Sequence, residues 1–574
     1  MRKIYFLLVI SFLTGCFNPD KSKIIYFAHT GEITSLDPAY SYDAITHGTL
    51  INVYETLIGF DGDKLDSFIP LISEKVPSKE NGLISLDGKR YIFPIRKGIK
   101  FHNGDELEPE DVKYSLLRFM ITDMPGGPSA LLLEPIFGIT SVKDENGNLK
   151  IDKTDFEKAV KVEKNSVVIT LKRPFAPFLS IIARWSYVMN SRWAIKAGEW
   201  DGRYETIKEF SGGGRERSRI LDSECGSGPF SVVSWDRAKK QIILKSFDGY
   251  WRGKAKIDMV VQKTVSEFST RKLMIEKGDA DIIEVPRIYE SQLENVKGVR
   301  LYPNLKRLST DPVFFFTFDI NPTANPDIGS GRLDGEGIPP DFFKDENVRK
   351  AFAYAFNYDL FLKQSLKNKA ERAYNPVPPS VMMFDKIKKY EYSRTEAEKY
   401  FKKAFNGKLW EKGFKFTLTY NTGSDIRQLA CEILKKEIES INPKFRIDIR
   451  GIDWALYLEK SQNRRMPLFT RGWVGDYADP HNFVFAFYHS MGRYPQAQGF
   501  KDLKLDKMIE NAVRENDINK RKRLYESIIN YAFENIYQIY TVHPYGIMAV
   551  RENIEGFIDN PVIMGVYYYG MERR

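Results

Sequence analysis

The stretch YIFPIRKGIKFHNGDELEPEDVKYSLLR, residues 91–118, decides how the first half of this chain folds. An apolar run leads into a turn at His102-Asn103-Gly104-Asp105 and then into Glu108-Pro109-Glu110-Asp111. Proline and acidic groups favour the first turn of a helix, where N–H groups are unpaired and the helix dipole is positive. The apolar spacing that follows is helical. The stretch therefore predicts a strand, a turn and a capped helix in succession.

Strand and helix patterns alternate on either side of this stretch. Residues 83–101 predict a hairpin with its turn at Gly88-Lys89. Residues 24–27 predict a strand, and a helical pattern follows that runs on to Ile58. Further strands are predicted at 167–171, 230–235, 241–247, 414–420 and 445–451, and further helices at 269–278, 347–366, 395–405 and 425–441. Because 574 residues exceed one ordinary hydrophobic core, the mixture predicts an α/β protein of more than one lobe.

Composition narrows the classes of function. Hydrophobic residues make up 43% and charged residues 28% of the chain, which is typical of a soluble globular protein. The net charge is +10, but the Lys and Arg residues are spread along the chain, without a basic run or a nucleic-acid-binding motif. We therefore expect no nucleic-acid partner.

The beginning of the chain predicts export and lipid anchoring. Arg2 and Lys3 precede an apolar stretch, residues 4–13, that is too short for a membrane span of roughly 20 residues but suits a signal peptide. The stretch ends in Leu13-Thr14-Gly15-Cys16, which resembles the bacterial lipobox. We predict a lipoprotein signal peptide at 1–15 and a lipidated Cys16 that begins a tether at 16–23. The alternative is an ordinary signal peptide with a chance cysteine.

Export places the rest of the chain outside the cytoplasm, in the periplasm or at the cell surface, with the lipid as the only membrane contact. Two more cysteines, Cys225 and Cys431, are available for a disulfide in an oxidising compartment. Their separation in the sequence does not decide whether they lie within bonding distance.

Motifs of common enzymes do not occur in the sequence. There is no HExxH, no CxxC pair, no GxSxG elbow and no GxxxxGK[ST] phosphate loop. His481 and His489 stand eight residues apart, which is not a helical spacing for two metal ligands. We expect no enzymatic activity, no cofactor and no bound metal.

Several ordered stretches carry a resemblance to a known family. The chain resembles the family 5 extracellular solute-binding proteins, the peptide- and nickel-binding group of ABC importers. The matching stretches are TSLDPAYSYDAITHGTLINVYETLIGFD (34–61), the opening stretch (91–118), GSGPFSVVSWDR to DADI (226–282), DENVRKAFAYAFNYDLF (345–361), NPVPPS (375–380), RGWVGDYADPHNF (471–483) and IYTVHPYGIMAVRENIEGF (539–557).

The resemblance implies a fold like that of type II periplasmic binding proteins. Two hinged lobes would surround a cleft, with an additional subdomain in the first half. The implied limits are 24–50, 190–312 and 541–574 for lobe I, 51–189 for the extra subdomain, and 313–540 for lobe II. The chain would cross between the lobes near Val313–Phe316 and Tyr540–His543, the segments that a hinge closure would bend.

The resemblance also implies ligand contacts. In peptide-binding members an Asp in a Trp-x-x-Asp-Tyr stretch binds the α-amino group of the peptide, and the matching residue here is Asp476, between Trp473 and Tyr477. Those two aromatic residues would wall side-chain pockets, unless they belong to the core. The loop Tyr40–Ala44 would pair its backbone with an extended peptide, chiefly through Tyr42 and Ala44.

No arginine stands out as the partner of a ligand carboxylate; Arg471 and Arg493 are the candidates. The resulting hypothesis is a monomeric lipoprotein that captures peptides by hinge closure and delivers them to an ABC permease and ATPase complex. Three alternatives remain open: a binding protein for a nickel chelate, haem or an oligosaccharide, a ligand-sensing lobe without transport, and an extracytoplasmic hydrolase.

Overall fold

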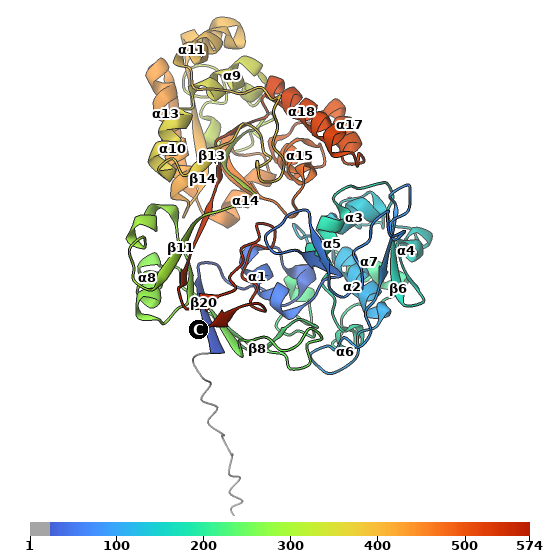
Figure 1. Ribbon diagram of the computed structural model, residues 1–574. Coiled ribbons are helices and arrows are strands. Elements are labelled where there is room, and N and C mark those ends of the chain that lie inside the picture. The colour runs from blue at the N-terminus through green and yellow to red at the C-terminus, as the bar shows by residue number, and fades with distance from the viewer. Residues whose placement is uncertain (1–22) are drawn as a thin grey trace, which may run out of the picture.

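The strands gather into three larger sheets, each covered by its own helices (Figure 1). The structure is a computed structural model that describes residues 23–574. We name the three parts of the described chain after their sheets: the seven-stranded, the five-stranded and the three-stranded body. In Figure 1 the five-stranded body is at the top, the seven-stranded body at the lower left and the three-stranded body at the lower right.

The seven-stranded sheet has its earliest strand in the middle. Its order is β11-β19-β10-β1-β9-β8-β7, and β1 pairs in parallel with β9 and β10. Phe27 of β1 packs into the main core while the next residue, Ala28, packs against α8 (Phe268–Lys277), since successive strand residues face opposite sides. The strands are β1 (Ile24–His29), β7 (Phe230–Asp236), β8 (Gln241–Ser246), β9 (Met259–Thr264), β10 (Ile282–Glu284), β11 (Val299–Leu305) and β19 (Gly546–Arg551).

The end of the chain returns to the start of the described body. The short strands β20 (Ile554–Glu555) and β21 (Glu572–Arg573) pair, and the Arg573 guanidinium donates to the carbonyl of Ile24 over 2.7 Å. The two ends of the described chain therefore lie side by side.

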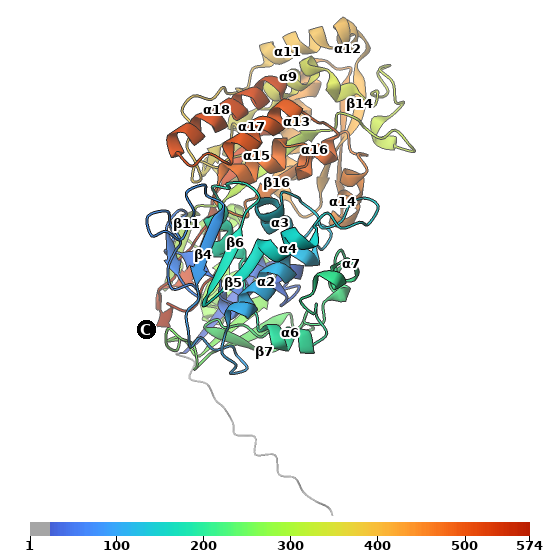
Figure 2. The same ribbon diagram turned by 90° about the vertical axis from the view of Figure 1, so that its right-hand side faces the viewer.

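The three-stranded body contains residues 91–118, the stretch with which the sequence analysis began (Figure 2). The predicted helix is α2 (Pro109–Thr122), and its capping is confirmed: the Asp111 carboxylate accepts from the N–H of Glu108 over 2.9 Å. The other elements are β4 (Arg90–Pro94), β5 (Val160–Glu163), β6 (Ser166–Thr170), α3 (Ala130–Phe137), α4 (Lys153–Ala159), α5 (Phe178–Trp185), α6 (Ser191–Lys196) and α7 (Ile207–Phe210).

The hairpin predicted at 83–101 forms only in part. Ile92 N–H donates to the carbonyl of Leu83 over 2.8 Å across the turn at Gly88, but the continuous partner of β4 is β6.

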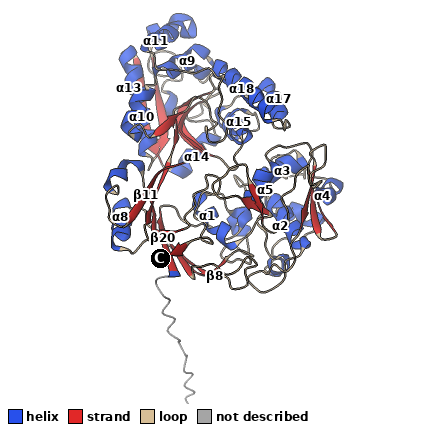
Figure 3. Ribbon diagram, in the orientation of Figure 1, coloured by secondary structure: helices blue, strands red, loops and turns tan. Residues whose placement is uncertain are grey.

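The five-stranded sheet has the order β15-β14-β16-β12-β17, with helices on both sides (Figure 3). Its strands are β12 (Ser309–Phe316), β14 (Phe414–Asn421), β15 (Phe445–Ile452), β16 (Leu468–Val474) and β17 (Gln538–Tyr540). Its helices are α9 (Glu346–Ala355), α10 (Tyr358–Leu366), α11 (Arg394–Lys403), α12 (Lys408–Lys412), α13 (Asp425–Ile441), α14 (Trp454–Gln462), α15 (Pro480–Tyr488), α16 (Arg493–Gln498), α17 (Leu503–Ala512) and α18 (Ile518–Asn535).

Two predicted helices are wrong in extent. Helix α1 (Ala44–Val53) stops before Ile58. The N–H of Gly228 donates to the carbonyl of Val53 over 2.9 Å, in place of the next helical N–H. A Cβ on Gly228 would lie 2.6 Å from that carbonyl carbon, so only glycine permits the approach. Residues 58–60 form β2 (Ile58–Phe60), which pairs with β3 (Phe68–Pro70). The helix predicted at 347–366 is two helices, because the Asn357 side chain caps α10 at Leu360.

The two predicted crossing segments lie next to each other in the five-stranded sheet. Val313 of β12 stands opposite Tyr540 of the antiparallel β17. The next strand, β18 (Val542–Pro544), pairs with β13 (Ala370–Arg372). The residue limits of the lobes and of the extra subdomain stay predictions.

Cys225 and Cys431 are both buried and free, so the disulfide left open by the sequence does not form. Within residues 23–574, no helix has the length and apolar character that a bilayer span requires. The predicted signal peptide at 1–15, the lipid site Cys16 and most of the tether at 16–23 lie outside the described residues.

Candidate functional site

A cavity of about 780 Å³ lies where the five-stranded and three-stranded bodies meet. In Figure 2 this junction lies between α3, in the three-stranded body, and β16, in the five-stranded body above it. One wall comes from residues 123–141, which include α3. The other wall comes from β16, α14, α15 and α16. The residues that line it are Tyr42, Asp123, Met124, Pro125, Gly126, Gly127, Pro128, Ala130, Leu131, Glu134, Thr140, Ser141, Gly212, Leu458, Ser461, Gln462, Arg471, Trp473, Asp476, Tyr477, Asn482, Phe485, Ala486, Met491, Arg493, Gln496 and Ala497.

Asp476 lies between β16 and α15 and is only 5% exposed. Its Oδ2 accepts a hydrogen bond from the Tyr42 hydroxyl over 2.9 Å and a weaker one from the Asn482 amide over 3.4 Å. Burial raises the pKa of this carboxyl, and the nearby Arg184 guanidinium opposes the rise. No cation of the described chain forms an ion pair with Asp476, so this buried carboxylate can accept a cationic group.

The backbone around Asp476 is held from both bodies. On its own side, the Asn482 Oδ1 accepts from the indole N–H of Trp473 over 2.9 Å and from the N–H of Asp476 over 3.2 Å. From the three-stranded body, the indole N–H of Trp185 donates to the carbonyl of Asp476 over 3.0 Å. The carboxylate therefore has a fixed position at the junction.

Trp473 and Tyr477, the two aromatic residues predicted to wall pockets, both line the cavity. Trp473 is half-buried, with its ring edge-on to that of Tyr494 at 5.9 Å between centroids. Tyr477 is deeply buried, and its hydroxyl lies 2.9 Å from Nδ1 of His481. Their roles as pocket walls stay predictions.

The loop before α1 contributes one side chain to the cavity. Tyr42 lines it and reaches Asp476, whereas Tyr40 is fully buried and Ala44 lines a separate cavity of about 250 Å³. The structure thus brings four of the six predicted contacts together: Tyr42, Trp473, Asp476 and Tyr477. Backbone pairing of the loop with a ligand stays a prediction.

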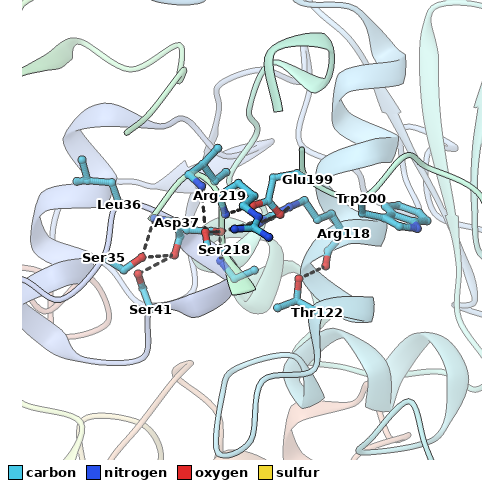
Figure 4. Close-up of polar contacts among 12 residues, drawn as sticks. Ser35, Leu36, Asp37, Ser41, Arg118, Thr122, Glu199, Trp200, Ser218 and Arg219 are labelled. Atoms are coloured by element: carbon cyan, nitrogen blue, oxygen red, sulfur yellow. Dashed lines mark hydrogen bonds and ion pairs between the residues drawn. The ribbon is translucent and has the colours of Figure 1, made fainter. Parts of the chain in front are cut away.

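A buried ionic cluster holds the segment that leads to Tyr42 (Figure 4). The Arg118 guanidinium donates to both carboxylate oxygens of Asp37, over 2.8 and 2.6 Å, and to Glu199 over 2.6 Å. Ser218 donates to Asp37 over 2.7 Å, and Ser41 donates to the Asp37 carbonyl over 2.8 Å. All three charged side chains are at most 1% exposed. The sequence pattern does not reveal this cluster, because its members are 81 residues apart.

Both candidate cations, Arg471 and Arg493, line the cavity. Neither forms a hydrogen bond or an ion pair through its guanidinium within the described chain. The Arg471 guanidinium carbon lies 5.0 Å from the centroid of the Trp454 ring. Burial lowers the pKa of Arg471, and the neighbouring Arg493 adds to this effect. The pair can accept an anionic group.

Two acidic residues of the cavity were missed by sequence reasoning. Glu134 of α3 lies 3.5 Å from Arg173 and 3.4 Å from Nε2 of His481, and burial raises its pKa to about 7. Asp123 at the end of α2 accepts from the N–H of Val142 over 2.7 Å. No motif distinguishes them from the other acids of the chain, because they line the cavity only through the folding of α2 and α3 at the junction. The described residues contain no group of three or more His, Cys, Asp or Glu suited to hold a metal.

Comparison with known proteins identifies the family. The family model described as "Bacterial extracellular solute-binding proteins, family 5 Middle" matches residues 78–495. The chain belongs to the bacterial extracellular solute-binding proteins of family 5. It is therefore a binding protein of the extracytoplasmic space and not an enzyme, as the sequence predicted.

Individual relatives can be aligned with this chain over almost its whole length. The dipeptide-binding protein DppE of Bacillus subtilis is 25% identical over 557 residues, which cover 94% of this chain and 90% of that protein. The periplasmic binding protein DppA of Helicobacter pylori, solved with the peptide STSA, superposes with a TM-score of 0.74 at 21% identity, covering 96% of this chain and 98% of that one. NikZ of Campylobacter jejuni, solved with Ni(L-His), gives a TM-score of 0.71 at 19% identity, with coverages of 96% and 100%. The predicted α/β fold of the periplasmic binding proteins is confirmed.

Proposed function

We propose that the protein binds short peptides in the cavity of about 780 Å³ between the two bodies. The observation that carries the proposal is that one cavity is lined by unpaired charges of both signs: the Asp476 carboxylate and the Arg471 and Arg493 guanidinium groups. A free peptide has a cationic and an anionic end, so it complements both. Dipeptide-binding relatives support this choice of ligand.

The energetic reason is the desolvation of Asp476. A buried carboxylate without a partner costs free energy, and an ammonium group at hydrogen-bond distance offsets it by about 1.5–3 kcal/mol. Tyr42 already occupies one side of Oδ2 and orients the group. Arginine suits the opposite end because its planar donors match a carboxylate.

Capture would proceed by closure of lobe II, residues 313–540, on the rest of the chain. Val313 and Tyr540 are neighbours in one sheet, which supports bending at a single place. A ligand that touches both sides favours the closed form. A change from 1:99 to 99:1 needs about 5.5 kcal/mol of differential affinity, which charged contacts at both ends of a peptide can supply.

We also propose that Cys16 carries a lipid and that the tether at 16–23 keeps the monomeric protein beside an ABC permease and ATPase complex. The Leu13-Thr14-Gly15-Cys16 motif supports the anchor. The membership in family 5 supports the delivery of ligand to a transporter.

Native mass spectrometry of freshly purified protein tests the ligand class, because captured peptides would appear as a ladder of masses. Calorimetry with a tripeptide, its N-acetylated form and its C-terminal amide tests the two ends. We expect acetylation to weaken binding at least about tenfold, since it removes the cation. Equal affinity for the acetylated form, or binding of a nickel chelate, haem or oligosaccharide in place of peptides, contradicts the proposal.

A further inference from the structure

Arg184 in α5 is a buried cation that makes no hydrogen bond within residues 23–574. It is 3% exposed, and its Nε, Nη1 and Nη2 all lack a partner there. Its guanidinium carbon lies 5.0 Å from the centroid of the neighbouring Trp185 ring. A buried guanidinium without hydrogen bonds costs several kcal/mol, so its position needs an explanation.

The helix that carries Arg184 is fixed directly against Asp476. Trp185, the next residue, donates its indole N–H to the Asp476 carbonyl over 3.0 Å, and its ring lies 5.8 Å from that of Tyr42. Asp476 is the carboxylate whose charge acts on Arg184, together with the hydroxyl groups of Tyr187 and Tyr42. No ion pair or hydrogen bond joins the two charged groups within the described chain.

Because Arg184 does not bond to Asp476, one oxygen of the Asp476 carboxylate stays available to a ligand. Oδ2 of Asp476 accepts from Tyr42 and Asn482, while Oδ1 has no hydrogen-bond partner in the described chain. A direct ion pair with arginine would occupy both oxygens, as Arg118 occupies those of Asp37. A cation that is near the carboxylate without being bonded to it stabilises the charge and still leaves an oxygen for a ligand.

We propose that Arg184 acts at a distance as the counter-charge that keeps Asp476 ionised in the closed cavity, and that this makes the site selective for ligands with a protonated amine. The inference rests on the proposed function, in which Asp476 binds the amino end of a peptide. Without the cation, a proton would neutralise the carboxylate, and a protonated carboxyl would accept a neutral ligand group as readily as an ammonium.

The other groups around Asp476 do not replace Arg184. Tyr42 and Asn482 are neutral donors, and Tyr477 is held neutral because burial raises its pKa. His47 beside Trp185 is also neutral, because burial and the nearby Arg184 lower its pKa to about 3. Arg493 also acts on Asp476, but less strongly than Arg184.

The test measures tripeptide binding by calorimetry from about pH 4.5 to about pH 7.5 in the wild type, Arg184→Met and the matched control Arg184→Lys, which keeps the charge. We expect the acid limb of affinity to move up by at least about half a pH unit in Arg184→Met and to stay in place in Arg184→Lys. Near the upper limit, Arg184→Met should bind as tightly as the wild type or more tightly, because the cation no longer repels the ammonium. An unmoved limb, or an equal loss at every pH, overturns the proposal.

A second measurement needs no variant at position 184. Near pH 7, calorimetry of the wild type in buffers of different ionisation enthalpy should show almost no proton release on tripeptide binding, because Asp476 is already ionised. Release of about one proton per peptide overturns the proposal. Asp476→Asn separates the two hypotheses: if it binds like the wild type, the assignment of Asp476 as the amine site fails, whatever Arg184 does.

Discussion

Two buried groups of charges differ in how completely their oxygens are paired. In the first, Arg118 joins Asp37 and Glu199, and Ser218 and backbone N–H groups take further lone pairs of the two carboxylates (Figure 4). In the second, Arg184 and Asp476 are equally buried but do not touch, and one oxygen of Asp476 stays without a partner in the described chain.

The difference separates two uses of a buried charge. A saturated cluster has nothing left to offer a ligand, and it joins elements that are distant in the sequence. An unsaturated one costs stability, and that cost is reduced when a ligand of the right charge arrives. The comparison predicts opposite effects of substitution at the two places.

The largest expected effect is on stability, at the saturated cluster. Arg118→Met leaves two buried carboxylates without their cation and should lower the free energy of unfolding by about 3–5 kcal/mol. Denaturant titration followed by fluorescence measures it. Arg349→Met, at a buried arginine that donates to backbone carbonyls only, is the control for the loss of a buried guanidinium. A change below about 1 kcal/mol in Arg118→Met contradicts the comparison.

At the second group, substitution of Asp476 should lower the affinity for peptides without lowering the stability of the fold. Burial raises the pKa of Asp476, so its ionised form costs stability above the unfolded pKa and this cost disappears at low pH. Asp476→Asn should therefore weaken tripeptide binding at least about tenfold while the free energy of unfolding at pH 7 stays equal or rises. A clear loss of stability would show that Asp476 belongs with the scaffold.

The two cavity arginines should affect one class of peptide more than another. Arg471→Gln and Arg493→Gln remove a cation that has no partner in the described chain, so folding should tolerate both. If one of them binds the carboxyl end, its loss should weaken the binding of free peptides by about 1.5–3 kcal/mol. The binding of C-terminal amides should stay unchanged. Calorimetry with the two peptide forms identifies which arginine it is. Equal effects on both forms exclude that arginine.

The smallest expected effect is at Tyr42. Its hydroxyl donates to Asp476, and this hydrogen bond lowers the pKa of the carboxyl. Tyr42→Phe removes one donor, so the acid limb of peptide binding should move to higher pH and affinity should fall by about 0.5–1.5 kcal/mol. The same calorimetric titration over pH measures both. An increase in affinity would mean that Tyr42 competes with the ligand for Asp476.

The sequence predicted the fold well where local signals agree. The capped helix after Glu108 and the helix at 425–441 follow from residues that are neighbours in the chain. The prediction failed where distant backbone decides: α1 ends at Val53 because Gly228 takes its last carbonyl. No periodic pattern contains such a contact.

The site residues, too, were predicted where they are neighbours in the sequence and missed where they are not. Trp473, Asp476 and Tyr477 belong to one short motif, and the resemblance identified them together. Glu134 lines the cavity from α3 and Arg184 acts on Asp476 from α5; both come from elements far from the motif in the sequence, so no motif pointed to them.

The contact of Arg573 with Ile24 has a practical consequence. Because the two ends of the described chain lie side by side, a short linker could join them, and new ends could be opened in a mostly exposed turn such as 145–148. A reporter fused to Arg574 would, for the same reason, lie close to Ile24, the residue that follows the proposed tether.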